Sequence, residues 1–415
     1  MSMREYFNKI GRFVRTPVVG IPEEESEELE ASIDIIKTSS TLVDVLEIDL
    51  KHIEENCINF DFFIDGVERT HVISQITIPN NPPIPVVASH VVSGALGIQK
   101  DLRDYIECCL LIFPHQAVME FLNLHGISIP LPQLDYSGDF FTKCRQYSLV
   151  YSKPTFFIDS SWKLEKRGER SINKEDLPAL GKIRRIALAR VDVVRRSLEL
   201  GEVSHIRSIN PNSWILYDGP LVRPMFLAYG RLAKNNLEYL TTTERRTFNF
   251  LKRIIGVVKE VRRIPTERIY EAFDYDASRK IIKVPLYRIY DNDHAHLVHA
   301  FMMLRPELFE IEPVAISPTA GLIRVDIPIP AILEEYDPEW FQFSPNIDNK
   351  IRRNIDKVEA IIKGILKLRY PLPETSSIHR ILTELYHIHV VESYLKNVLL
   401  PSNDLLRYFV SEVIY

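Results

Sequence analysis

The chain has 415 residues, of which 46% are hydrophobic and 26% charged, and its net charge is −5. These proportions are ordinary for a soluble globular protein, and no apolar run approaches the roughly 18 residues of a membrane-spanning segment. We expect a cytoplasmic protein, because the N-terminus has neither the apolar core nor the cleavage site of a secretory signal. The four cysteines show no CxxC spacing, which disfavours a zinc site and a disulfide framework.

Basic residues gather in two segments despite the acidic net charge. Between residues 182 and 196 there are six lysines and arginines and one acid, and between residues 245 and 268 there are eight against two acids. Phosphate contacts are local, so such clusters can line a groove for a nucleic acid. Solvated helix faces have the same composition, so charge alone leaves both interpretations open.

The first half of the chain is predicted to pass from helix to sheet. Residues 1–55 are expected to form a helical arm with an acidic break near residues 20–28, because apolar residues between 29 and 53 recur at helical spacing. The segments FDFFIDG, HVISQITIP and PVVASHVVSGALGI then predict three strands of an antiparallel meander. Residues 101–178 are interpreted as an insertion that begins with one or two helices broken at Pro114 and contains a small β element of its own.

The second half alternates helices and strands. The predicted elements are a basic amphipathic helix over 177–200, the strand SWILYDGPL, a helix over 243–253, the strand IIGVVKEV, strands such as LFEIEPVAIS and GLIRVDIPIP between 281 and 330, and helices over roughly the last 70 residues with a break at 370–373. A meander followed by this alternation indicates an α/β fold. It fits an RNase H-like mixed sheet flanked by helices, with an inserted segment and a helical C-terminal region. We therefore expect an arm, residues 1–55, and one domain, residues 56–415.

Two of the predicted strands end in the same pair, Asp-Gly. Phe62–Gly66 reads FFIDG and Ile215–Gly219 reads ILYDG, and in each case the glycine permits a tight exit and keeps space open above the carboxylate. If the strands are neighbours, Asp65 and Asp218 converge, and a divalent cation removes their mutual repulsion. The simpler interpretation is that each aspartate caps a turn. The run Phe157-Ile158-Asp159 could also replace one of the two motifs.

Five segments with chemical character occur in a fixed order along the chain. They are FFIDGVERTHVIS, the arginine-rich VDVVRRSLEL, WILYDGPL, IIGVVKEVRR and RYPLPETSSIHRI. This order resembles the motifs of the NurA family of nucleases: a first Asp-Gly strand, a helix with a catalytic glutamate, a second Asp-Gly strand, a later strand ending in lysine, and a Tyr-Pro segment followed by a functional histidine. In this sequence the glutamate, lysine and histidine are Glu199, Lys259 and His379. The resemblance extends from Asp65 to His379, and the order is more specific than any single motif.

The resemblance implies an RNase H-like fold, a homodimer, and Mn²⁺-stimulated cleavage of single- and double-stranded DNA. It also implies a hexameric HerA-type translocase ATPase as partner in DNA end resection during double-strand break repair. Asp65, Glu199 and Asp218 would bind Mn²⁺ or Mg²⁺, and His379 would carry protons or act as a late metal ligand. The residues expected to contact DNA are Lys259, Arg262, Arg263, Arg195 and Arg196.

Other functions stay open on sequence alone. They are a catalytically silent adaptor of a HerA-type ATPase, a phage-defence nuclease subunit, and a nuclease acting on RNA. The chain has no P-loop, so an ATPase would have to be a separate protein. A second metal site around His294, His296 and His299, on a helix, is disfavoured because the HExxH arrangement is missing. His387 and His389 are interpreted as packing residues of a helix.

Overall fold

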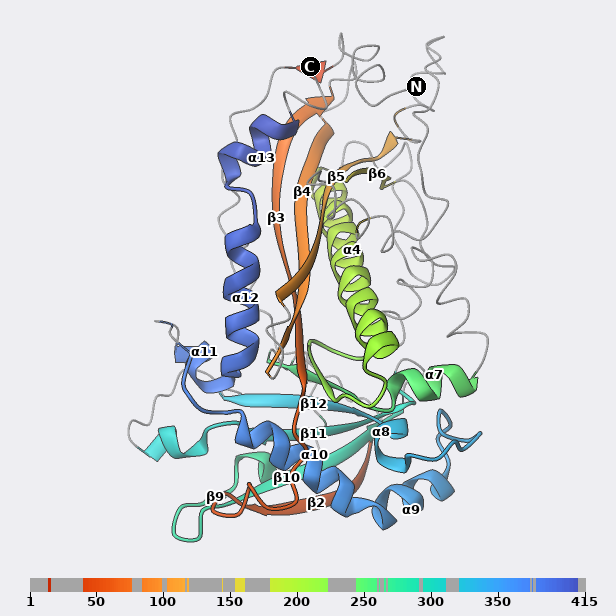
Figure 1. The fold of residues 1–415 in the computed structure, drawn as a ribbon, viewed down its shortest axis with the longest axis vertical. Coiled ribbons are helices and arrows are strands. Elements are labelled where there is room, and N and C mark those ends of the chain that lie inside the picture. Colours follow the sequence, from red (N-terminus) through yellow and green to blue (C-terminus); the bar gives the residue numbers. More distant parts are fainter. Residues whose placement is uncertain are drawn as a thin grey trace.

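The chain folds as a mixed α/β structure, shown in Figure 1. This computed structural model describes residues 14–15, 40–76, 84–98, 103–115, 154–160, 180–222, 244–259, 268–290, 294–310, 321–373 and 378–409, together with the single residues 118, 144, 261, 265 and 375. A large mixed sheet is flanked by helices, in agreement with the α/β class predicted from the sequence. None of the helices in these residues is long and apolar enough to cross a membrane.

Twelve strands of the described residues form a single sheet. Ten of them follow the order β2-β10-β11-β12-β8-β7-β3-β4-β5-β6, while the short β1 and β9 pair with β3 and β10. The strands are β1 (Val14–Arg15), β2 (Ser40–Asp49), β3 (Phe62–Ile76), β4 (Ile84–Gly97), β5 (Arg103–Phe113), β6 (Thr155–Asp159), β7 (Ile215–Asp218), β8 (Ile254–Val258), β9 (Tyr275–Asp276), β10 (Ile281–Ile289), β11 (Leu297–Met303) and β12 (Leu322–Pro328).

The direction of the strands changes at the middle of the sheet. Strands β3, β4 and β5 form an antiparallel meander, and β7 and β8 continue the sheet from β3, each parallel to its predecessor. Strand β12 is antiparallel to β8 and leads to β11, β10 and β2. The long strands β3 and β4 run along the long axis of the molecule, and the β2–β10–β11–β12 part crosses them at one end (Figure 1). Strands β7 and β8 therefore connect the two parts of the sheet.

Helices cover both faces of the long strands. Helix α4 (Leu180–Ile209) packs against β3, β4 and β5, and α12 (Tyr386–Val398) packs against β3 and β4 from the other side (Figure 1). The remaining helices are α7 (Glu244–Leu251), α8 (Ile329–Leu333), α9 (Pro345–Arg353), α10 (Ile355–Lys367), α11 (Ile378–Thr383) and α13 (Ser402–Tyr408), with the 3₁₀ helices η3 (Ile269–Phe273) and η4 (Pro306–Glu310).

Most elements of the second half match their prediction. The basic helix is α4, and its apolar residues Ile183, Val191 and Leu198 are buried as the spacing predicts. The strands ILYD, IIGVV and LIRVDIP are β7, β8 and β12, and the predicted helix before β8 is α7. The C-terminal region is helical, with a break between α10 and α11. The start of LFEIEPVAIS belongs to η4 and its end lies outside the described residues.

The helical prediction for residues 1–55 is wrong at residues 40–49, which form strand β2. Strand β2 pairs with β10 along its length apart from one bulge, so a long ladder of backbone hydrogen bonds outweighs a weak helical spacing. The core-facing residues of β2, Val43, Leu46 and Ile48, are buried against the main hydrophobic core. Except for β1, the rest of the predicted arm up to residue 39 lies outside the described residues.

The predicted helix after residue 101 is also wrong, because Arg103–Phe113 is strand β5. Every side chain from Cys108 to Phe113 is buried. A strand covered on both faces is a continuous apolar run, which periodicity cannot separate from a buried helix. The predicted separate β element is β6, and it joins the main sheet beside β5. Most of the remaining insertion lies outside the described residues.

Strand β3 corrects the prediction of two strands divided at the first Asp-Gly pair. It continues through Asp65 and Gly66 to Ile76, and pairs with β4 along its length. Asp65 therefore lies inside a strand, whereas Asp218 ends β7 as predicted. A position inside a sheet fixes the backbone beneath the Asp65 carboxylate more firmly than a turn does.

Candidate active site

Asp65 and Asp218 come from adjacent parallel strands. Phe62, Phe63 and Ile64 of β3 stand opposite Ile215, Leu216 and Tyr217 of β7. The next position on each strand is the aspartate, so the two carboxylates project from neighbouring positions on the same face. This convergence is what the two matched Asp-Gly motifs predict.

The face on which the two carboxylates lie is the one covered by α12. Phe63 stacks on His387 of α12, with ring centroids 4.7 Å apart. A Cβ atom added to Gly66 would instead meet Glu199 and Arg195 of α4. Because side chains alternate along a strand, Asp65 shares the α12 face with Phe63, and Gly66 faces α4.

Lys259 bridges the aspartate pair to a third acid. Its Nζ atom lies 2.8 Å from Oδ2 of Asp218 and 2.9 Å from Oε1 of Glu384, which follows α11. Burial lowers the pKa of Lys259, but Asp218, Glu384 and Asp65 raise it by more, so that it lies well above its usual value. Lys259 is therefore an ammonium ion at every working pH and offsets part of the negative charge.

The charge on Asp65 is poorly compensated. Asp65 is 4% exposed, and its Oδ1 atom accepts a hydrogen bond of 2.7 Å from the backbone N–H of Gly66. Burial, followed by repulsion from Asp218, raises the pKa of Asp65 well above its usual value, although Lys259 lowers it. Strongly shifted pKa values cluster at functional sites. A buried carboxyl whose pKa is raised by burial and by a second carboxylate therefore marks a candidate site.

Glu199 lies on the opposite face of β3. Its side chain is fully buried and accepts a hydrogen bond from the hydroxyl of Tyr217, and Nη1 of Arg195 donates to its Oε1 at 2.8 Å. Gly66 has no side chain, and this absence allows Glu199 and Arg195 to approach the strand. Glu199 still helps to raise the pKa of Asp65, though less than burial and Asp218 do. The structure thus places Glu199 near Asp65 but turns its carboxylate towards Tyr217 and Arg195.

Both arginines of α4 that are predicted to bind DNA have partners within the protein. Arg195 forms ion pairs with Glu68, Asp192 and Glu199 at 3.3, 2.7 and 2.8 Å. Arg196 pairs with Asp192 at 3.0 Å. Arg195 therefore connects α4 to β3 through Glu68, whereas the ion pair of Arg196 lies within α4. Arg262 and Arg263 lie outside the described residues.

The predicted histidine, His379, is in α11, but its side chain lies outside the described part. The next residue of α11, Arg380, pairs with Glu392 at 3.0 Å and lies 3.7 Å from Glu384. Its guanidinium also interacts electrostatically with Asp218. The backbone of α11 therefore runs beside the candidate site.

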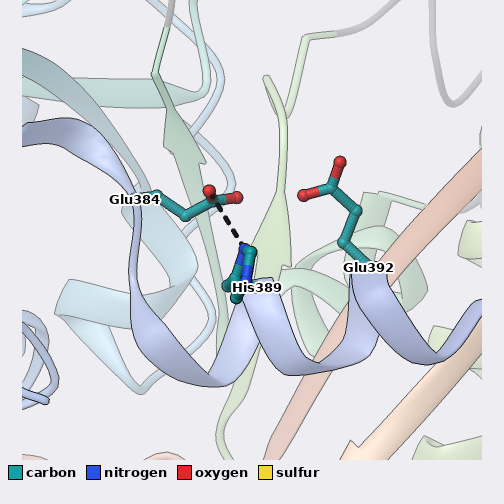
Figure 2. Close-up of side chains that lie close together, drawn as sticks. All are labelled: Glu384, His389 and Glu392. Atoms are coloured by element: carbon teal, nitrogen blue, oxygen red, sulfur yellow. Dashed lines mark ion pairs between the residues drawn. The ribbon is translucent and has the colours of Figure 1, made fainter. Parts of the chain in front are cut away.

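An acidic group at the start of α12 was not predicted from the sequence. Glu384, His389 and Glu392 offer ligand atoms that all lie within 4.8 Å of one another (Figure 2). Among the described residues this is the group of three that lies close enough to hold a metal ion, and Asp65, Glu199 and Asp218 are not gathered as tightly. The available signal was the spacing of His389 and Glu392, three residues apart on an amphipathic helix, which places both on one face.

The other sequence candidates lie elsewhere. Asp159 pairs with Phe113 of β5. Asp65 pairs with Gly94 of β4, which in turn pairs with Tyr105 of β5, eight residues before Phe113. At the rise of a strand this separation is about 27 Å, so Asp159 does not replace Asp65. His299 is in β11 and not on a helix.

Buried polar groups fasten the turn after Asp218. Leu221 donates its backbone N–H to Oδ2 of Asp326 at 3.1 Å, and Nε2 of His296 donates to the carbonyl of Leu221 at 2.8 Å. His299 and Arg324 donate to Oδ1 of the same Asp326 at 2.8 and 2.7 Å. These histidines therefore hold the second Asp-Gly turn in place.

The same turn depends on Gly219, whose φ of 135° is a conformation that favours glycine.

Asp326→Asn is expected to destabilise the protein by about 3 kcal/mol at pH 7, because it leaves Arg324 without its buried counter-charge. Burial raises the pKa of Asp326, but Arg324 and His299 lower it by more, so the net shift is downward. The carboxylate's contribution is therefore complete above a pH of about 4 and is lost as the pH falls towards the folded-state pKa. Urea unfolding at pH 7 and pH 3 should show a smaller difference between variant and wild type at pH 3. An equal difference at both pH values would contradict the assignment.

The chain was compared with models of known protein families and with curated proteins, and neither comparison gave a match.

Proposed function

We propose that this chain is a divalent-metal-dependent DNA nuclease of the NurA type. The observation that carries the proposal is the convergence of Asp65 and Asp218 from adjacent parallel strands, with Lys259 bonded to Asp218 on the same face. Two carboxylates and a lysine are suited to binding a metal ion and a phosphodiester together. Nothing in a purely structural sheet requires this concentration of charge.

The order of the central strands supports an RNase H-like core. Strands β5, β4 and β3 are antiparallel, β7 and β8 follow in parallel with β3, and α4 lies between the meander and β7 in the chain. An RNase H-like sheet has the same order and directions. The strand pair that carries Asp65 and Asp218 is then the pair that carries the acidic residues of such enzymes.

The residues present fit Mn²⁺ or Mg²⁺. Asp65 and Asp218 offer hard oxygen ligands, and burial and repulsion raise the pKa of Asp65, so a cation there would stabilise its ionised form. The bound metal would supply water activation and stabilisation of the leaving oxygen. Glu199 receives a supporting role in this proposal, because its hydrogen bonds hold Tyr217 and Arg195 beneath the strand pair.

The chain's own residues would position the DNA backbone. Lys259 stays protonated and can exchange one carboxylate partner for a phosphate oxygen. Arg262 and Arg263, which follow Lys259 closely in the sequence, are assigned further contacts with DNA phosphates. His379 is assigned the proton-carrying role that the resemblance implies.

The resemblance also supports a biological setting. We propose a cytoplasmic homodimer that acts in DNA end resection and double-strand break repair, with a hexameric HerA-type ATPase as partner. The chain has no P-loop, so translocation along DNA would come from that separate protein.

The test is cleavage of labelled oligonucleotides by the purified chain. Single-stranded DNA, double-stranded DNA and RNA of the same sequence are incubated with Mn²⁺, with Mg²⁺ or with a chelator. We expect cleavage of both DNA substrates with Mn²⁺ and none with the chelator. Cleavage of RNA alone would overturn the substrate assignment, and no cleavage with either metal would favour the adaptor.

A further inference from the structure

The group of Glu384, His389 and Glu392 has a geometry that the proposed nuclease chemistry does not use. His389 and Glu392 lie one helical turn apart on α12, and Glu384 precedes the helix. Figure 2 shows the Glu384 carboxylate directed at the imidazole, with Glu392 on the other side of the ring. The Nδ1 atom of His389 lies 3.4 Å from Oε2 of Glu384.

Two buried polar atoms in this group lack hydrogen bonds. Within the described part of the chain, neither Oε2 of Glu384 nor Nδ1 of His389 has a hydrogen-bond partner, although both are shielded from solvent. The Glu384 side chain is only 1% exposed, and its Oε2 atom lies 3.4 Å from Nδ1 of His389 and 3.7 Å from Nη1 of Arg380, without a hydrogen bond to either. A buried carboxylate oxygen without a hydrogen bond is costly, and such a group in a folded protein calls for a ligand or a functional role.

The geometry points to a transition-metal site formed by Glu384, His389 and Glu392. Carboxylate oxygens combined with an imidazole nitrogen suit Zn²⁺, Mn²⁺ or Co²⁺, whereas Mg²⁺ prefers oxygen ligands alone. The other ring nitrogen of His389 lies 3.5 Å from the Ser393 hydroxyl. A polar partner on the second nitrogen is the usual arrangement for a metal-bound histidine, because it fixes the ring orientation.

The cations now beside Glu392 can give way to a metal. Arg380 bonds both carboxylate oxygens of Glu392 at 3.0 and 3.1 Å, and Lys396 pairs with it at 2.8 Å. The side chains of Arg380 and Lys396 are 38% and 47% exposed. Glu392 itself is only 11% exposed, so these cations can turn towards solvent when a divalent ion replaces them as its counter-charge.

This site is adjacent to the proposed nuclease site but separate from it. Glu384 bonds Lys259 through Oε1 and faces His389 through Oε2. A metal bound to Oε2 neutralises part of the negative charge of Glu384. Glu384 then attracts Lys259 less strongly, and the ammonium group is freer to bind a phosphate. Occupancy of this site is thus linked to the neighbouring one through a shared carboxylate, while the metal binding itself does not depend on nuclease activity.

The test measures binding of Zn²⁺ to the folded, metal-stripped chain by equilibrium dialysis, and binding of Co²⁺ by its visible spectrum. We expect His389→Ala to weaken the tightest Zn²⁺ equivalent by about 100-fold and to abolish the spectrum of imidazole-bound Co²⁺. Glu392→Gln is expected to have the same direction of effect. Circular dichroism of each variant confirms that it is folded.

The matched control is His387→Phe, which removes the other imidazole of the same turn and keeps an aromatic ring against Phe63. It should bind Zn²⁺ as the wild type does. If His389→Ala keeps full affinity, or the wild type binds no Zn²⁺, the inference is overturned. Asp65→Asn should bind the tightest Zn²⁺ ion as the wild type does. The metal site at Glu384, His389 and Glu392 can therefore be demonstrated even if the chain cleaves no DNA.

Discussion

Asp65→Asn is expected to lower Mn²⁺-dependent DNA cleavage by about 10³-fold while leaving the chain folded. The substitution keeps the shape of the side chain but removes the charge that would hold the metal and organise the reacting groups. Because burial and Asp218 raise the pKa of Asp65, its ionised form destabilises the metal-free fold at neutral pH. The asparagine variant should therefore be at least as stable as the wild type without metal. Initial rates and urea unfolding of the same preparation check both expectations.

Asp159→Asn is the matched control for this experiment. Asp159 follows Phe157 and Ile158, as Asp65 follows Phe63 and Ile64, and it too ends a run of apolar residues in the sheet. It lies about 27 Å from the candidate site along the sheet. Its variant should cleave DNA at the wild-type rate per folded molecule. Equal losses in both variants would indicate a general structural effect, and full activity in Asp65→Asn would remove Asp65 from the site.

The sequence predicts those parts of the fold whose local pattern and tertiary environment agree. In the first turns of helix α4 the buried Ile183 and Ile186 alternate with the exposed Arg184 and Arg185, so the helical period can be read there, and β7 is a short apolar run closed by Asp-Gly. Strand β5 fails because it is buried on both faces and shows no alternation. Strand β2 fails because its stability comes from β10, more than 200 residues away in the chain. Such long-range pairing leaves little trace in a local window.

The candidate site divides in the same way. The convergence of Asp65 and Asp218 could be predicted only on the condition that their strands are neighbours, which the parallel pairing of β3 with β7 meets, although Asp65 lies within β3 and not at its end. The side on which Glu199 lies could not, because it depends on the phase of α4 against β3 and on the gap left by Gly66. Glu384 belongs to no sequence motif, because it is a single acid between two helices. The path of the chain from α11 to α12 brings it to Lys259. Single acids acquire a chemical role only through the tertiary fold.

Lys259→Met is expected to destabilise the metal-free protein by about 3 kcal/mol at neutral pH. The lysine is the cation between Asp218 and Glu384, whose side chains are 15% and 1% exposed, and methionine would leave both carboxylates buried without it. Because the raised pKa of Lys259 keeps it charged, its contribution is complete below a pH of about 10 and is lost only as the pH rises through the folded-state value. Urea unfolding at pH 7.5 in the presence of a chelator measures the loss.

Mn²⁺ is expected to restore part of that stability in Lys259→Met, because a divalent ion bound to Asp218 and its neighbours can replace the missing positive charge. DNA cleavage should nevertheless remain about 100-fold below wild type, since the metal compensates for the charge but not for the contact of the ammonium with the phosphate. Lys283→Met is the control: Lys283 pairs with Asp274 at the surface, at 2.7 Å, and its loss should leave the stability unchanged. If Lys259→Met were as stable as Lys283→Met without metal, Lys259 would not be the counter-charge of the aspartate pair. If Mn²⁺ failed to stabilise the Lys259→Met protein, the acids beside it would not form a metal site.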